Sequence, residues 1–204
     1  MTAPHIHLAS KSLRRQELLR QIGVDFDLLK MREAAGRERD VVEGARDAEP
    51  PLHYVERMAR TKVAVAWLQM RQRKLPERPV LSADTEVVLD GVIFGKPTDD
   101  RDAARMLNAL SGHTHQVMTA VALRLRERTE VELSISNVEF RRLSAQEIKH
   151  YVATGEPDDK AGAYAIQGKA AAFVTRLDGS FSGVVGLPLA ETAALLARIG
   201  MPVL

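Results

Sequence analysis

The sequence contains no cysteine, which excludes disulfide bonds, thiol nucleophiles and cysteine-ligated zinc. Aromatic residues make up only 4% of its 204 residues, so few side chains could stack on the bases of a single-stranded nucleic acid. The formal net charge is +2, far below the positive stripe expected of a protein that coats duplex DNA. We therefore expect no stable nucleic-acid complex.

The sequence also lacks a hydrophobic run of transmembrane length, and its first residues do not form the basic and apolar segments of a signal peptide. Neither a P-loop nor a dinucleotide-binding fingerprint nor a G-x-S-x-G elbow occurs. Hydrophobic residues nevertheless make up 45% of the chain and charged residues 27%, as in a protein with a buried core. We expect a globular protein with no membrane partner, located in the cytoplasm.

Apolar periodicity predicts a mixed α/β protein rather than a regular alternation of parallel strands and helices. The segment 79–97 reads as a strand, a polar interruption, a second strand, an Asp-Gly turn and a third strand. Segments 113–125 and 131–143 alternate as an antiparallel pair of strands would, and 171–186 suggests a hairpin. A further strand is expected at 4–9, and helices are expected at 12–22, 52–72, 98–112, 144–157 and 189–200.

The segment between the first expected strand and the first expected helix is rich in hydroxyl and basic side chains. Ser12 is predicted to cap the helix and Gly23 to end it. Free backbone N–H groups make the start of a helix a site for an anion, and the charges of Arg14 and Arg15 strengthen that site. The apolar face of this helix is expected to consist of Leu13, Leu18, Leu19 and Ile22.

Three further polar side chains are candidates for phosphate chemistry, and each also has a purely structural interpretation. Asp84 follows an apolar run, where a carboxylate can hold a divalent cation, orient a water molecule or merely cap a turn. Lys96 lies in a Gly-Lys-Pro turn and Lys62 on an amphipathic helix, where each can reach a phosphate or simply face solvent. The residues alone leave both interpretations open.

The segment 159–173 is rich in small residues around Tyr164 and Gln167. Small residues let a backbone approach a ligand closely, and a carboxamide offers both a donor and an acceptor to the edge of a base. Ordinary packing would explain the same composition. His113 and His115 would point to one face of a strand, but no third metal ligand is evident nearby, so we expect no histidine-bound metal.

The chain resembles the Maf family of nucleoside triphosphate pyrophosphatases in blocks that run in order over nearly its whole length. The family pattern LAS-x-S-PRR-x-ELL corresponds to LASKSLRRQELL, and ADT followed by a GKP turn corresponds to ADTEVVLDGVIFGKP. MLNALSGHTH, YVATGEPDDKAGAYAIQG and VVGLPL match further blocks. Leu13 stands where the family usually has a proline, which would preorganise the first helical turn.

This resemblance implies a Maf/Ham1-like α/β fold with a mixed, largely antiparallel sheet flanked by helices. Residues 1–204 would form a single domain with two lobes around a deep central cleft. The resemblance also implies a homodimer that converts a nucleoside triphosphate and water into the monophosphate and pyrophosphate, with Mg²⁺ or Mn²⁺ as the divalent cofactor. Because the family is also associated with septum formation and growth arrest, a non-enzymatic interaction protein is the competing hypothesis.

The resemblance further assigns roles to individual residues. Asp84 would be the proton acceptor that activates water, and Asp84 and Glu43 would bind the metal. Glu33 is the rival of Glu43 for this role, because the segment 34–40 looks like an insertion. The triphosphate would be held by Ser10, Arg14, Arg15, Lys62 and Lys96.

Substrate preference follows from three of the matching positions. Arg14, Thr85 and Gln167 resemble the family branch that acts on dTTP and UTP, whereas the branch that prefers 7-methyl-GTP has Trp, Gln and Glu-type replacements there. Hydroxyl and carboxamide groups can bond the edge of a pyrimidine, but a cationic methylated purine favours an aromatic and an acidic side chain. The resemblance therefore implies dTTP and UTP as substrates, including modified pyrimidine nucleotides, with 7-methyl-GTP as the alternative.

Overall fold

The computed structural model describes residues 4–30, 41, 44–46 and 48–203. Its strands are β1 (His5–Leu8), β2 (Asp25–Leu28), β3 (Val80–Leu89), β4 (Val92–Phe94), β5 (Thr114–Leu125), β6 (Arg128–Phe140) and β7 (Val174–Asp178). Its helices are α1 (Leu13–Gln21), α2 (Pro51–Gln72), α3 (Asp100–Leu110), α4 (Ala145–Val152), α5 (Phe181–Val185) and α6 (Leu189–Arg198), with the 3-10 helices η1 (Ala161–Ala163) and η2 (Lys169–Phe173). None of the helices in these ranges is long and apolar enough to cross a membrane.

The strands form one seven-stranded sheet in the order β2-β1-β3-β5-β6-β7, with β4 paired to β3. β1 runs parallel to both β2 and β3, whereas the pairs β3–β5, β5–β6 and β6–β7 are antiparallel. The expected mixed, largely antiparallel sheet is therefore confirmed. β2 had no counterpart in the sequence prediction.

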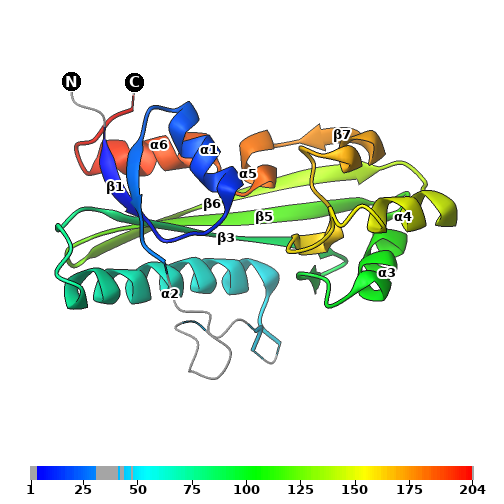
Figure 1. Ribbon diagram of the computed structural model, residues 1–204, viewed down its shortest axis with the longest axis horizontal. Coiled ribbons are helices and arrows are strands. Elements are labelled where there is room, and N and C mark those ends of the chain that lie inside the picture. Colours follow the sequence, from blue (N-terminus) through cyan, green and yellow to red (C-terminus); the bar gives the residue numbers. More distant parts are fainter. Residues whose placement is uncertain (1–3, 31–40, 42–43, 47, 204) are drawn as a thin grey trace.

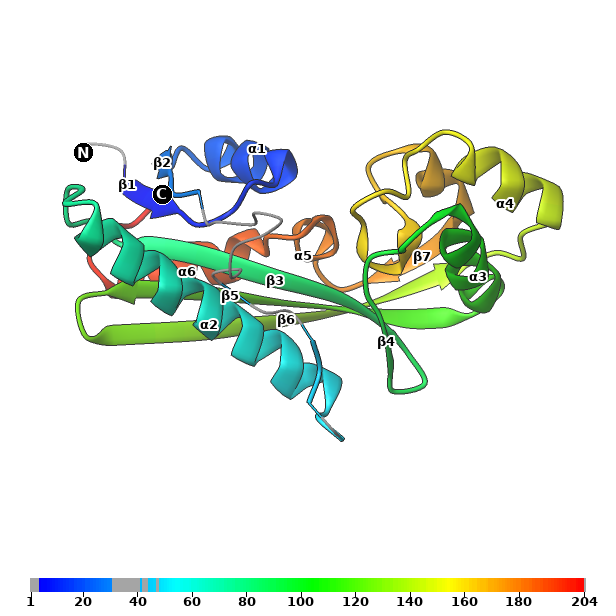
Figure 2. The same cartoon turned by 60° about the horizontal axis from the view of Figure 1, so that its bottom comes forward.

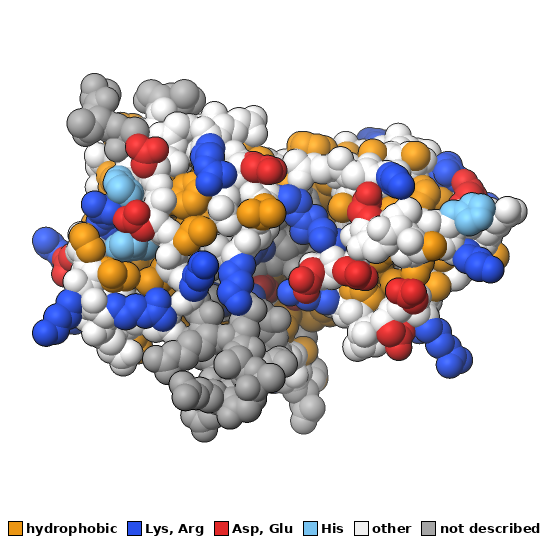
Figure 3. Space-filling model, in the orientation of Figure 1, with side chains coloured by type: hydrophobic (Ala, Val, Ile, Leu, Met, Phe, Trp, Pro, Cys, Tyr) orange, Lys and Arg blue, Asp and Glu red, His pale blue; other side chains and the backbone are white. Residues whose placement is uncertain are grey.

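The long strands β3, β5 and β6 run through the length of the molecule and connect two groups of helices (Figure 1). At one end, α2 covers one face of the sheet while α1, α5 and α6 cover the other; α3, α4 and the 3-10 helices gather at the opposite end (Figure 2). One cluster of buried apolar side chains lies under α2, a second under α1, α5 and α6, and a third between the sheet and the helices of the opposite end. The surface is hollowed between the two groups, and charged side chains line the rim of the hollow (Figure 3).

Local signals in the sequence are confirmed at the ends of the helices. Ser12 caps α1 by accepting a hydrogen bond from the backbone N–H of Arg15, and Gly23 follows α1 with a φ of 71°. Ser144 and Glu147 form a capping box at the start of α4. The long antiparallel pair β5–β6 also lies where the alternation of apolar residues predicted it.

Three expectations are wrong. β3 continues through the expected polar interruption, because its polar side chains find partners in α2: Ser82 Oγ donates to the carbonyl oxygen of Ala59 at 2.8 Å. The expected hairpin over 171–186 is instead β7 followed by α5, whose N-cap Ser180 accepts from the backbone N–H of Gly183. Leu13 is 71% exposed and does not join the apolar face of α1.

Candidate active site

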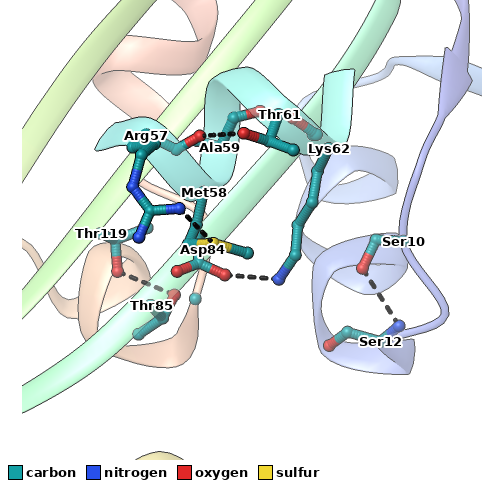
Figure 4. A network of polar contacts seen from close by, with 12 residues as sticks. Ser10, Ser12, Arg57, Met58, Ala59, Thr61, Lys62, Asp84, Thr85 and Thr119 are labelled. Atoms are coloured by element: carbon teal, nitrogen blue, oxygen red, sulfur yellow. Dashed lines mark hydrogen bonds and ion pairs between the residues drawn. The ribbon is translucent and has the colours of Figure 1, made fainter. Parts of the chain in front are cut away.

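The centre of the candidate site is an ion pair between α2 and the middle of β3. Lys62 Nζ donates to Asp84 Oδ1 at 2.5 Å, and the two side chains are only 13% and 8% exposed (Figure 4). The turn of α2 that carries Lys62 packs on β3 through buried apolar neighbours such as Met58 and Ala59. The helix–sheet packing therefore presents the ammonium group to the carboxylate.

The two oxygens of the Asp84 carboxylate differ in their surroundings. Oδ2 is buried and accepts no hydrogen bond from the residues that the structure describes. Buried polar atoms are usually paired, so an unpaired carboxylate oxygen calls for an explanation. A carboxylate oxygen is a preferred ligand of Mg²⁺ and Mn²⁺ and can also accept a proton, so the donor chemistry at this point fits a divalent cation or a water molecule.

Arg15 connects the loop before α1 to β3 and to the end of α5. Its Nε donates to the carbonyl oxygen of Gly186 at 2.7 Å, and Nη2 donates to Thr85 Oγ1 at 3.1 Å. Its Nη1 lies 3.4 Å from Ser10 Oγ, which also accepts from the backbone N–H of Ser12 at 3.2 Å. The guanidinium group thus fixes the hydroxyl-rich loop predicted to bind phosphate.

Thr119 belongs to the same network, although the sequence analysis did not select it. It pairs in register with Thr85 across β3 and β5, and its hydroxyl oxygen lies 3.0 Å from that of Thr85. The same hydroxyl donates to the carbonyl oxygen of Gly183 at 2.8 Å. A threonine among the apolar residues of a long strand was the available signal, and Figure 4 shows Thr119 directed toward Thr85.

Asp84 and Thr85 are consecutive in β3 and therefore face opposite sides of the sheet. Asp84 lies on the side covered by α2, where it meets Lys62. Thr85 lies on the side covered by α1 and α5, where it meets Arg15 and Thr119. The structure therefore brings four of the predicted residues together in two pairs, Lys62 with Asp84 and Arg15 with Thr85, one on each side of a single strand.

Arg14 of α1 interacts electrostatically with side chains at the other end of the sheet. Its pKa is lowered, mainly by burial, and its charge acts on Tyr151 of α4. Burial also lowers the pKa of Lys160, and the positive charge of Arg14 lowers it further. Two cations from different ends of the sheet therefore lie close enough to repel each other, which favours an anion between them. The sequence analysis did not select Lys160.

Lys96 and Gln167 lie at the other end of the sheet from the Lys62–Asp84 pair. Lys96 Nζ is 3.5 Å from Asp159 Oδ1, and both side chains are largely exposed. The turn that contains Lys96 contacts η1, since the backbone N–H of Gly162 donates to the carbonyl oxygen of Gly95 at 3.1 Å. Gln167 is exposed in the segment between η1 and η2.

The expected metal ligand Glu43 and its rival Glu33 lie outside the described residues. Within the described residues, no cluster of three or more histidine, aspartate or glutamate side chains could hold a metal ion. His115 is buried, where Nε2 lies 2.8 Å from the hydroxyl oxygen of Tyr164 and the ring packs edge-on against Phe140. Burial lowers the pKa of His115 to about 4, so its imidazole is neutral at pH 7.

The curated relatives and the family model each match nearly the whole chain. A protein named dTTP/UTP pyrophosphatase from Nitrosomonas europaea is 56% identical over 97% of this chain and 96% of its own length. A protein of the same name from Aromatoleum aromaticum is 54% identical over the same shares of the two chains. The solved structure of the Staphylococcus aureus Ham1 protein superposes with a TM-score of 0.43 at 14% identity, over 67% of this chain and 71% of that one. A family model described as "Maf-like protein" matches residues 5–199, and the chain belongs to the Maf family.

Proposed function

We propose that this chain hydrolyses dTTP and UTP to the corresponding monophosphate and pyrophosphate. The observation that carries the proposal is an identity above 50%, over nearly the full length, to relatives that bear the name of this activity. In the reaction, one P–O–P linkage of the triphosphate is broken, and water supplies the oxygen of the new P–O bond. The chain must therefore activate water, balance the phosphate charge and select the base.

Asp84 is the proposed proton acceptor. Lys62 holds Oδ1 at 2.5 Å and so fixes the orientation of the carboxylate, while Oδ2 has no donor among the described residues. An oriented carboxylate with one unengaged oxygen is suited to take the proton of an attacking water. General-base catalysis of this kind contributes about 10²- to 10⁴-fold to the rate, which sets the expected loss when the carboxylate is removed.

A divalent cation, Mg²⁺ or Mn²⁺, is the proposed cofactor. When bound, such an ion supplies positive charge to the phosphates and lowers the pKa of water. In this chain Asp84 Oδ2 would hold the ion through one of its two lone pairs and keep the other for the proton of water, and Glu43 is the second proposed ligand. We expect Glu43→Gln to raise the Mg²⁺ concentration needed for half-maximal activity and Glu33→Gln to leave it unchanged. This result would support Glu43, rather than Glu33, as the second ligand.

The proposed triphosphate ligands come from separate elements: the start of α1, helix α2 and the turn after β4. The residues concerned are Ser10, Arg14, Arg15, Lys62 and Lys96. The N-terminus of α1 adds its own partial positive charge, and the neighbouring charges of Arg14 and Lys160 support an anion near them. Selection of the pyrimidine base is proposed to depend on Arg14, Thr85 and Gln167.

The test is a panel of dTTP, UTP, CTP, GTP and 7-methyl-GTP with Mg²⁺ or Mn²⁺, assayed for release of pyrophosphate. We expect metal-dependent cleavage of dTTP and UTP, reduced about 10²- to 10⁴-fold in Asp84→Asn. Asp90→Asn is the matched control: Asp90 lies in the turn that follows β3, is exposed, and has a φ of 51° that asparagine tolerates. The control variant should retain full activity.

Two other outcomes would each redirect the interpretation. Activity confined to 7-methyl-GTP would retain the family chemistry and overturn the pyrimidine assignment of Arg14, Thr85 and Gln167. No activity toward any nucleotide, in a protein that is folded by circular dichroism, would favour the non-enzymatic interaction hypothesis. An unchanged rate in Asp84→Asn would refute the proposed proton acceptor.

We also propose that the chain forms one domain of two lobes around a single cleft, that it is a homodimer, and that it acts in the cytoplasm. All three follow from the family resemblance. A single cooperative unfolding transition would support the one-domain organisation. Light scattering on the purified protein would distinguish a dimer from the 22.5 kDa monomer, and cell fractionation would test the location.

A further inference from the structure

The segment Ala165–Gly168, which carries Gln167, has no regular secondary structure of its own. It lies between η1 and η2, and the Gln167 side chain makes no hydrogen bond with the residues that the structure describes. A side chain can select a base only if the backbone that carries it is held in place. The position of the Gln167 carboxamide therefore depends on what fixes the two ends of this segment.

Tyr151 of α4 fixes the first end. Its hydroxyl oxygen accepts a hydrogen bond from the backbone N–H of Ala165 at 3.2 Å and donates its own proton to Glu156 Oε1 at 2.9 Å. The phenol is 4% exposed, and its ring packs edge-on against Phe173 at a centroid distance of 5.0 Å. Burial raises the pKa of Tyr151, so the hydroxyl keeps the proton that it donates.

Glu156 fixes the second end. Its Oε2 accepts from the backbone N–H of Lys169 at 3.0 Å, and its Oε1 accepts from the backbone N–H of Ala170 at 3.3 Å. These two N–H groups belong to the first turn of η2, directly after Gly168. Gly168 makes the approach feasible, because a Cβ at this position would lie 2.3 Å from Glu156 Oε1. The carboxylate thus occupies the space that a side chain would need.

Glu156 is itself held by the turn after α4. Its backbone N–H donates to Thr154 Oγ1 at 3.2 Å, and the Thr154 hydroxyl donates to the carbonyl oxygen of Tyr151 at 2.6 Å. The charge of Arg14, a second proposed specificity residue, also acts on Tyr151. The charge of Arg14 therefore acts on the residue that holds the first end of the segment of Gln167.

We infer that Glu156, acting with Tyr151, is a positioning residue for nucleobase selection, because it anchors the backbone that carries Gln167. The inference rests on the proposed function for its substrate, but the anchoring itself concerns the chain alone. Glu156 touches neither Asp84 nor Lys62 by any hydrogen bond or ion pair between described residues. Its loss should therefore alter which base is preferred more than the activation of water.

The first variant is Glu156→Gln, which keeps the size and shape of the side chain. Its amide has one oxygen and one NH₂ group, so either orientation places a donor opposite a backbone N–H of Lys169 or Ala170. We expect the ratio of kcat/KM for dTTP to that for CTP to fall about tenfold, a loss typical of one misplaced polar contact. The kcat for dTTP should fall less than the ratio does.

Glu147→Gln is the matched control. Glu147 is another carboxylate of the α4 region that accepts a backbone N–H, that of Ser144, and it also pairs with Arg141. It makes no hydrogen bond to residues 165–170 among those described. Both variants are expected to lower the unfolding temperature, and only Glu156→Gln is expected to change the dTTP/CTP ratio. An equal change in both variants would reduce Glu156 to a general structural residue and overturn the inference.

A double-mutant cycle with Gln167→Ala tests whether Glu156 acts through Gln167. In the wild-type background Gln167→Ala should lower the dTTP/CTP ratio; in the Glu156→Gln background it should have little further effect, because the carboxamide is already displaced. Fully additive losses would overturn the inference. If Glu156→Gln does not fold, Tyr151→Phe replaces it in the cycle, since it removes the hydroxyl bonds to Ala165 and Glu156 while keeping the packing on Phe173.

Amide hydrogen exchange without nucleotide separates this inference from the proposed function. The backbone amides of Ala165, Lys169 and Ala170 should exchange about tenfold or more faster in Glu156→Gln than in wild type. In Glu147→Gln they should exchange at the wild-type rate. Unchanged exchange would overturn the anchoring role, whatever the enzyme does. A wild-type protein that hydrolyses no nucleotide, with exchange that changes as expected, would refute the proposed function while leaving the anchor supported.

Discussion

Removal of the Lys62 charge tests the ion pair at the centre of the candidate site. At 2.5 Å the gross attraction between Lys62 Nζ and Asp84 Oδ1 is about 6–7 kcal/mol for an effective dielectric constant of about 20. Desolvation of two groups that are only 13% and 8% exposed offsets much of it. The single variant Lys62→Met leaves the buried carboxylate without this cation and should lower the free energy of unfolding by about 3–5 kcal/mol.

A double-mutant cycle that combines Lys62→Met with Asp84→Asn distinguishes charge pairing from simple packing. Asp84→Asn introduced into Lys62→Met removes the buried charge that has lost its ion-pair partner, so the double variant should recover part of the lost stability. The coupling energy between the two substitutions is expected to exceed about 1 kcal/mol. For a chain of this size each kcal/mol corresponds to about 2–4 °C in Tm, so urea denaturation and thermal unfolding can both resolve it.

An exposed ion pair supplies the control. Arg105 pairs with Asp102 at 2.7 Å within α3, and the Arg105 side chain is 65% exposed. Arg105→Met should therefore cost less than about 1 kcal/mol. If Lys62→Met costs as little as Arg105→Met, or if its effect simply adds to that of Asp84→Asn, the buried ion pair does not stabilise the fold as argued.

Three further predictions test other parts of the fold. Arg15→Lys should lower the free energy of unfolding by about 1–3 kcal/mol in urea, because an ammonium group cannot reproduce the guanidinium bonds to three separate segments. The pKa of His115 is lowered by burial from 6.5 to about 4, so the unfolded chain binds a proton that the folded chain does not; stability should fall by about 3 kcal/mol as the pH drops from 6.5 to 4. That slope should flatten in His115→Gln and persist in His113→Gln, and equal slopes in all three proteins would contradict the assignment. Gly162→Ala should cost about 2–4 kcal/mol, since φ is 68° and a Cβ would lie 2.8 Å from Val87 Cγ2. Gly91→Ala, where φ is also positive but nothing lies within 4 Å of the added Cβ, should cost less in the same denaturation assay.

Local chemistry made much of the fold predictable. The Ser12 cap, the Gly23 terminus and the capping box of Ser144 depend on residues within four positions of one another, so the sequence carries their whole signal. The uninterrupted β3 strand also had a local signal. Ser82 and Asp84 alternate with Leu81 and Ala83, which is the period of a strand, but polar side chains inside an apolar run were interpreted as a break.

The contacts that assemble the site are not local and left no such signal. Arg15 donates to the carbonyl oxygen of Gly186, which is 171 residues away in the chain. Backbone carbonyl groups are identical in every residue, so no pattern of residue types could have identified this partner. Thr119 meets Thr85 only because β3 and β5 pair in one particular register. The motif resemblance identified Arg15 and Thr85, but the contacts that they make could be found only from the folded structure.

The alternation of side chains along β3 also limits how this enzyme family can change. Asp84 and Thr85 are separated by one peptide unit yet serve opposite sides of the sheet. A substitution at Thr85, which is proposed to take part in base selection, should therefore leave the carboxylate on the other side undisturbed. An insertion or deletion of one residue before Asp84 would exchange the two sides, moving the carboxylate away from Lys62 and into the Arg15 network. Point substitutions in this strand can thus be tolerated during evolution, whereas a change in its length before Asp84 would separate Asp84 from Lys62.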